Sequence, residues 1–163
     1  MIWAEVFFSP ISGPKSIQSL ILGRKILRGG RGLEILAARI AATCEQARHR
    51  TELEAHATSL LHMLAEVDRT LEAVRAMPPA RQLDNAASFQ TAFGLLVIGW
   101  IWLDQARVAA ALPGQDPDTL RLRNGKMATC RHFFECELPQ ATPHLAQVAK
   151  GSDLNSTVDP AIF

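Results

Sequence analysis

The sequence is short of cysteine, and the cysteines that it has are not spaced for pairing. Its 163 residues include only Cys44, Cys130 and Cys136, with no Cys-x-x-Cys pair. An odd number without paired spacing argues against a disulfide framework and against a structural zinc site. We therefore expect a protein of a reducing compartment, the cytoplasm.

An excess of charge of one sign is also missing. Seventeen basic and sixteen acidic residues are interspersed and give a formal net charge of +1. Nucleic-acid-binding domains usually carry a basic patch, so we do not expect a nucleic-acid partner. The sequence has no His-Glu-x-x-His pattern, and His56 and His62, six residues apart, fall on different faces of a helix. We expect no metal site.

Long hydrophobic runs are absent as well. The longest apolar run, residues 92–103, is shorter than the roughly 20 residues that a bilayer-spanning helix needs, so it predicts a buried core helix and no membrane span. The apolar residues 1–8 include Glu5 but no basic residue, and Pro10 follows closely. This pattern does not predict an export signal.

What the sequence does contain is helical periodicity. No useful strand-like alternation and no internal repeat follow residue 14, whereas apolar residues recur at intervals of three and four. We predict an all-α fold, an up-and-down antiparallel bundle of four to five helices, with a divergent N-terminal segment (residues 1–15), the bundle (16–150) and a polar tail (151–163). The expected helices span residues 16–28, 32–49, 50–77, 83–112 and 118 to an interruption at Pro139, followed by a shorter turn or helix over 143–150.

Several residues within these helices allow more specific predictions. Asp84 or Asn85 is available to cap the fourth helix, and Gly94 and Gly99 within it predict close approach of a neighbouring backbone. Cys130 and Cys136 lie six residues apart in a segment that includes Arg131. We expect buried cysteines here, and the alternative is a reactive thiol if Arg131 lowers its pKa.

The aromatic residues of the fourth helix have two interpretations. Trp100 and Trp102, together with Phe89 and Phe93, either belong to the core or form an aromatic ligand pocket.

Residues 11–18 carry a resemblance to a known family. They read Ile-Ser-Gly-Pro-Lys-Ser-Ile-Gln, which resembles the segment after the catalytic base of acyl-CoA dehydrogenases: Tyr-Glu-Gly-Thr, two small or polar residues, then Ile-Gln. Ser12 occupies the position of the glutamate base, and a hydroxyl is not a general base near neutral pH unless another base activates it. The sequence therefore predicts no catalytic residue at this position.

The same segment holds the only candidate cofactor contacts. The resemblance implies that residues just after the base lie near the flavin phosphates. Pro14, at the position of the threonine, has neither a hydroxyl nor a backbone N–H to donate. Gly13 and Gln18 match the family pattern, so they are either weak flavin-binding residues or a plain turn and a solvated side chain.

Two further stretches, residues 85–103 and 125–139, resemble the extra C-terminal helical domain of one branch of this superfamily, which includes methylmercaptopropionyl-CoA dehydrogenase. The resemblance then extends from about Gly13 to about Leu145. It implies an FAD-dependent parent enzyme of fatty acid metabolism that desaturates an acyl-CoA, with the flavin-covering domains absent from these 163 residues.

Two functions follow as expectations. The chain is a truncated or stand-alone C-terminal domain, catalytically inactive and without a cofactor of its own. Alternatively, it is an interaction module that forms a homo-oligomer or docks onto a full-length dehydrogenase, because its first helix carries an apolar stripe that includes Ile17, Leu20 and Ile21. A small enzyme with Ser12 or Cys130 as nucleophile has no motif to support it.

Overall fold

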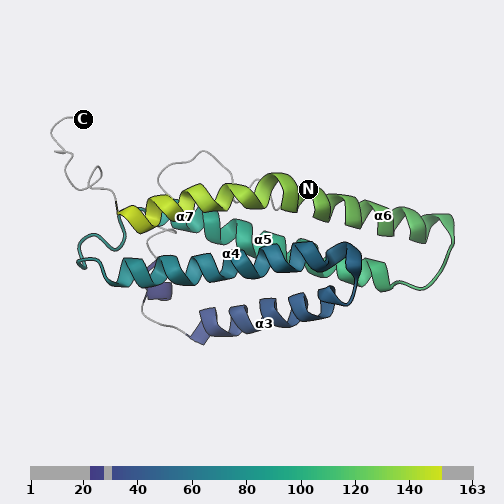
Figure 1. Cartoon of the computed structure of the whole chain (residues 1–163), viewed down its shortest axis with the longest axis horizontal. Helices are drawn as coiled ribbons and strands as arrows, with labels where there is room; N and C mark the ends of the chain where they lie inside the picture. Colours follow the sequence, from purple (N-terminus) through teal and green to yellow (C-terminus); the bar gives the residue numbers. More distant parts are fainter. Residues whose placement is uncertain (1–22, 28–30, 152–163) are drawn as a thin grey trace.

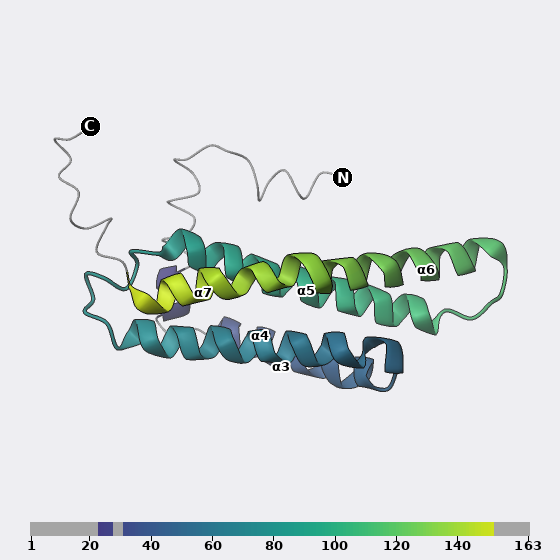
Figure 2. The ribbon, with the colours of Figure 1, turned by 45° about the horizontal axis from the view of Figure 1, so that its top comes forward.

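The computed structural model describes residues 23–27 and 31–151, and these form a helical bundle (Figure 1). Residues 23–27 are helical, which agrees with the C-terminal end of the predicted first helix; the rest of that helix lies outside the described residues. The predicted all-α fold is confirmed, and sequential long helices run antiparallel (Figures 1 and 2). The elements are α3 (Arg31–Arg48), α4 (Thr51–Arg75), α5 (Ala86–Ala111), α6 (Pro117–His132), η1 (Phe133–Glu137), η2 (Leu138–Gln140) and α7 (Ala141–Lys150).

The first antiparallel pair, α3 and α4, is joined by a tight connection at His49 and Arg50. Ile40 and Cys44 of α3 are fully buried, as is Leu53 of α4. Apolar residues at helical spacing give each helix one apolar side, and these two sides pack against each other. Because the connection is short, the helices can make this contact only when they run antiparallel.

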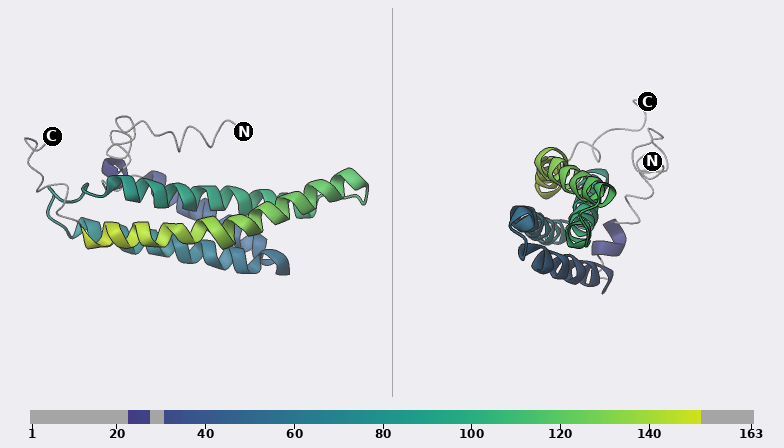
Figure 3. Two further views of the ribbon diagram at one scale, coloured as in Figure 1. Left: turned by 90° about the horizontal axis from the view of Figure 1, so that it is seen from above. Right: turned by 90° about the vertical axis from the view of Figure 1, so that its right-hand side faces the viewer.

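The central element of the bundle is α5, which packs against α3, α4, α6 and α7. Seen down the bundle, one side of α5 faces the other helices and the opposite side faces outward (Figure 3). It is long and apolar enough to cross a membrane by length and composition, and 39% of that apolar window is buried inside the bundle. The predicted core helix is therefore present, but only its inner side is core.

The two glycines of α5 do not have the role that the sequence predicted. A Cβ at Gly94 would meet nothing within 4 Å, so no backbone approaches it. A Cβ at Gly99 would lie 3.3 Å from both Leu60 Cδ1 and Phe133 Cε1, so the close neighbours are side chains. Gly99 admits the large side chains of α4 and η1 into the core, whereas Gly94 lies on the outward side.

The last arm of the bundle runs from α6 to α7 almost as one rod (Figure 3). Asp116 caps α6 by accepting a hydrogen bond from the Thr119 N–H at 2.9 Å, and Pro117 occupies the first turn. The predicted interruption at Pro139 takes the form of a π-helical turn, η1, and a 3₁₀ turn, η2. Proline has no N–H to donate to the α-helical pattern, and the π-helical and 3₁₀ turns accommodate this missing donor. The chain therefore continues into α7 without reversing direction.

Candidate functional site

The residues that the sequence singled out as a site, Ser12, Gly13 and Gln18, lie outside the described residues. Their assignments stay predictions. The described part of the chain contains a cavity near residues 23–27, the aromatic residues of α5 and the outward side of α5, as well as an open groove between α4 and α7 that Glu66 and Arg69 line.

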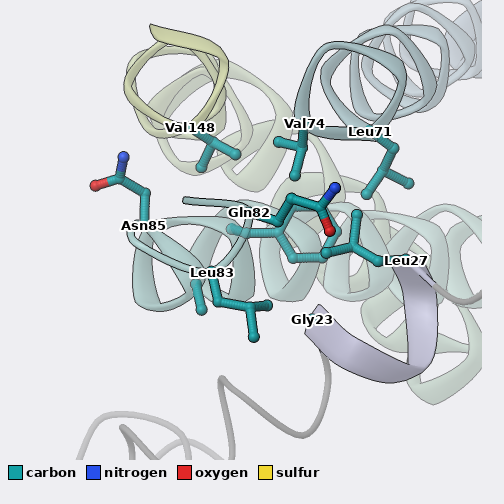
Figure 4. A pocket seen from close by; sticks show the side chains of 10 residues that line it. Gly23, Leu27, Leu71, Val74, Gln82, Leu83, Asn85 and Val148 are labelled. Atoms are coloured by element: carbon teal, nitrogen blue, oxygen red, sulfur yellow. The ribbon is translucent and has the colours of Figure 1, made fainter. Parts of the chain in front are cut away.

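A small cavity of about 20 Å³ lies at the end of the bundle where residues 23–27 approach α4 and α5 (Figure 4). Leu71 and Val74 come from the last turns of α4, and Phe89 comes from the first turns of α5. Its lining is Gly23, Leu27, Leu71, Val74, Gln82, Leu83, Asn85, Ala86, Phe89 and Val148.

The two polar side chains of this cavity are engaged in holding the fold. Gln82 Nε2 donates to the Met77 carbonyl at 3.1 Å, at the end of α4. Asn85 occupies the N-cap position of α5 without making a side-chain cap bond, and its Nδ2 instead donates to the Gln147 carbonyl at 3.3 Å. The described lining residues include no carboxylate, imidazole or thiol. The cavity therefore provides apolar contacts and no acid–base chemistry.

The aromatic side chains of α5 belong to the core or pack against it, which supports the core interpretation: Phe89 and Phe93 stack on each other, and the two tryptophans have different neighbours. Trp100 Nε1 donates a hydrogen bond to Thr43 Oγ1 of α3 at 2.8 Å. Trp102 lies under the ammonium group of Lys126 of α6, 5.3 Å from Nζ to the ring centroid. Because the two indoles point to opposite flanking helices, they do not converge on one ligand pocket.

The reactive-thiol interpretation of Cys130 is wrong. Its side chain is fully buried, and burial raises the pKa of the thiol to about 12. Arg131 is engaged elsewhere, since its Nε donates to Glu135 Oε1 at 2.7 Å. Burial also raises the pKa of Cys44, to about 11. The expected burial is wrong for Cys136, which is exposed. Cys44 and Cys130 are thus inert core residues, as their helical positions predicted.

A histidine packs against the π-helical turn. The His56 ring stacks on Phe134 with 4.8 Å between the ring centroids. Burial lowers the pKa of His56, and the nearby Glu135 carboxylate opposes this effect only in part. Within residues 23–27 and 31–151, histidine, cysteine, aspartate and glutamate side chains form no group of three that would hold a metal ion.

The outward side of α5 carries an apolar row that the described residues cover only in part: Gly94 and Val97 are half-buried, and Ile101 and Val108 are exposed. Gly94, Val97, Ile101 and Val108, hereafter the α5 stripe, recur at intervals of three, four and seven residues, on the side opposite the buried Gly99. Ile101 is 44% exposed and Val108 is 48% exposed. A helix that is apolar on all sides is normally covered on all sides.

Comparison with known proteins places this bundle in a family. The sequence model of the family described as "acetyl-CoA dehydrogenase C-terminal like" matches residues 36–158. The chain belongs to this family. The match spans most of α3 and all of α4 to α7, so the resemblance predicted for residues 85–103 and 125–139 is confirmed. No curated protein sequence and no solved structure matches the chain.

Membership of this acetyl-CoA dehydrogenase C-terminal-like family connects the bundle to FAD-dependent dehydrogenases, but the match begins at residue 36, beyond Ser12, Gly13 and Gln18. The α5 stripe does not stand out in the sequence. Its only sequence signal is the seven-residue spacing of Gly94, Ile101 and Val108, which a helix with apolar residues on all sides does not set apart from its buried side.

Proposed function

We propose that this chain has no dehydrogenase activity of its own and acts as a helical interaction module. The observation that carries the proposal is the α5 stripe. Its Ile101 and Val108 are apolar side chains exposed at the surface of a helix whose other side is buried in the core. The expected partners are a second copy of the chain or a full-length acyl-CoA dehydrogenase-like protein in the cytoplasm.

The absence of activity is argued from the residues that would carry it. Abstraction of an α proton from an acyl-CoA needs a carboxylate or similar base in a cleft that holds the substrate. Ser12 stands where the family resemblance places that base, and the described lining of the end cavity has no titratable group. We therefore propose that FAD chemistry belongs to the parent family and that this chain alone does not retain the cofactor.

One experiment tests both halves of the proposal. Purified protein is mixed with FAD, passed through a gel-filtration column and examined at the flavin absorbance bands, with light scattering to give its mass. We expect colourless protein that elutes as an oligomer or associates with a purified acyl-CoA dehydrogenase. Co-eluting FAD that an acyl-CoA reduces would overturn the inactive assignment, and a monomer that binds no dehydrogenase would overturn the interaction role.

A further inference from the structure

We infer that residues 1–8 of this chain fold back over the α5 stripe, with the Glu5 carboxylate paired to the Lys126 ammonium group of α6. This inference rests on the proposed function, because it supplies the regulation of the interaction module: a partner must displace residues 1–8 to reach the stripe. Residues 1–8 themselves lie outside the described residues. Three features of the described bundle point to this contact: where the chain enters it, how burial changes along the stripe, and which charge lies beside the stripe.

The chain enters the described bundle beside the first turn of α5. A Cβ built on Gly23 would lie 3.9 Å from the Ala86 Cβ. Glu5 lies eighteen residues before Gly23, and Trp102 lies sixteen residues after Ala86. Sixteen residues of helix span about 24 Å, whereas eighteen residues span about 27 Å as a helix and up to about 59 Å when extended. Residues 1–8 are therefore long enough a tether away to reach the stripe.

The burial of the stripe decreases with distance from this entry point. Gly94 and Val97, the members closer to the start of α5, are half-buried. Ile101 and Val108, farther along the helix, are 44% and 48% exposed. The apolar surface that still needs a cover is thus the far half of the stripe, where a further apolar segment of the chain would complete the burial.

Residues 1–8 have the composition of a segment that covers an apolar surface. Glu5 is their only charged residue, and five others are large and apolar: Ile2, Trp3, Val6, Phe7 and Phe8. So dense an apolar group is unfavourable in water and requires a complementary apolar surface. Because these residues are tethered to the bundle, their effective concentration at the stripe is roughly millimolar. A separate partner of equal intrinsic affinity would have to exceed that concentration.

The charge beside the stripe is complementary to the single acidic residue of the segment. Lys126 Nζ donates to the neutral Gln105 Oε1 at 2.7 Å. Among the described residues, no carboxylate forms an ion pair with Lys126. Asp104 does not fill this role, because its Oδ1 is paired with Arg107 Nη2 at 2.6 Å. Glu5 therefore brings a carboxylate to a side of the stripe where the cation has only a neutral partner.

Thiol labelling of the full chain tests the cover. The starting protein carries Cys136→Ser, because Cys136 is exposed, whereas the other two cysteines are buried. Ile101→Cys then reports the accessibility of the stripe. We expect a colorimetric thiol reagent to react with it at least about fivefold faster when Phe7→Asp is added, because the aspartate disfavours the apolar contact and raises the open population.

A control position and a concentration series complete this experiment. Thr58→Cys, on the exposed side of α4, should react equally fast with and without Phe7→Asp. Circular dichroism should show the same helix content in all variants. Protection of Ile101→Cys by its own chain does not depend on protein concentration, so protection that grows with concentration would assign the cover to a second copy and overturn the inference. Equal labelling rates with and without Phe7→Asp would overturn it as well.

An exchange of charges tests the pairing of Glu5 with Lys126. Glu5→Lys alone and Lys126→Glu alone should each speed the labelling of Ile101→Cys about two- to fivefold, as expected for the loss of an exposed ion pair. The double variant should restore the slow rate. Lys150→Glu makes the same charge change on an exposed residue at the end of α7 and should not rescue Glu5→Lys. A double variant that labels as fast as the single variants would overturn the pairing.

Partner binding separates this inference from the proposed function. A purified acyl-CoA dehydrogenase, or a second copy at high concentration, should bind the Phe7→Asp chain more tightly than the unmodified chain, by the factor seen in labelling. If Phe7→Asp exposes Ile101→Cys and neither partner binds, the cover is supported and the proposed function fails. If a partner protects Ile101→Cys equally well with and without Phe7→Asp, the proposed function is supported and this inference is overturned.

Discussion

The hydrogen bond between Trp100 and Thr43 provides the sharpest test of how α5 is held against α3. Trp100 Nε1 donates to Thr43 Oγ1 at 2.8 Å, and Thr43 Oγ1 donates in turn to the Arg39 carbonyl at 3.1 Å. Thr43 is only 8% exposed. Thr43→Val keeps the branched shape of the side chain but removes the acceptor, which leaves the indole N–H without its partner.

The expected cost follows from this geometry. An unsatisfied buried donor costs roughly 1–3 kcal/mol, and because the Trp100 bond is only partly buried, we expect about 1–2 kcal/mol. With a urea m-value of roughly 1–3 kcal/mol per molar, the unfolding midpoint should fall by about 1 M. Equilibrium unfolding followed by circular dichroism, at one fixed protein concentration, measures this shift.

A matched variant separates the effect of losing the Trp100–Thr43 hydrogen bond from the effect of removing a threonine hydroxyl from a helix. Thr91 on α5 makes the same type of bond to its own helix, from Oγ1 to the Ala87 carbonyl at 3.1 Å, but it is exposed and has no tryptophan partner. Thr91→Val should change stability by less than about 0.5 kcal/mol. A double-mutant cycle with Trp100→Phe should give a coupling of about 1 kcal/mol. Equal effects of Thr43→Val and Thr91→Val, with no coupling to Trp100→Phe, would refute the reasoning.

Three further predictions concern thiols, protons and packing. A colorimetric thiol reagent should titrate one thiol per native chain, Cys136, and three after unfolding in urea, since the other two are buried with raised pKa values. Burial lowers the pKa of His56 below its usual 6.5, so the unfolded state binds the extra proton first as the pH falls. The free energy of unfolding should therefore be highest above about pH 6.5 and should decrease as the pH drops toward the pKa of the folded state. The urea midpoint of His56→Gln should depend less on pH than that of the unmodified protein. In urea unfolding, Gly99→Leu should destabilise the bundle by about 1–3 kcal/mol, because the added side chain overpacks the core. Gly125→Ala should stabilise it by up to about 1 kcal/mol, because nothing lies within 4 Å of the added Cβ and alanine favours the helix.

Helix periodicity was enough to predict the bundle because local and tertiary preferences agree along it. The predicted spans 32–49, 50–77 and 83–112 differ from α3, α4 and α5 by a few residues at their ends, where capping groups and short turns decide the boundary. Asn85 illustrates this limit. It takes the predicted N-cap position, yet its amide donates to Gln147 of α7, a contact that local sequence does not specify.

The end cavity and the roles of the glycines could not be predicted for a related reason. Gly94 and Gly99 are five residues apart on one apolar helix, and sequence treats them alike. They differ because Leu60 and Phe133, remote in the chain, approach only Gly99. Periodicity gives the angle of a residue around its own helix, but the neighbours at that angle are set by the packing of the other helices.

The interruption that the sequence predicts at Pro139 is confirmed, but its form, a π-helical turn, depends on packing that the sequence does not specify. Pro139 does end the α-helical hydrogen-bond pattern, and the N–H of Leu138 bonds back to the Phe133 carbonyl in a wider turn. The wider turn shifts the side chains that follow relative to α6, which lets Phe133 and Phe134 both be buried, the first against Gly99 and the second against His56. An uninterrupted α-helix would place two adjacent residues about 100° apart, so burial of both requires core on two sides. Here α5 provides one side through Gly99 and α4 provides the other through His56, and α7 continues in the direction of α6 after the irregular turn.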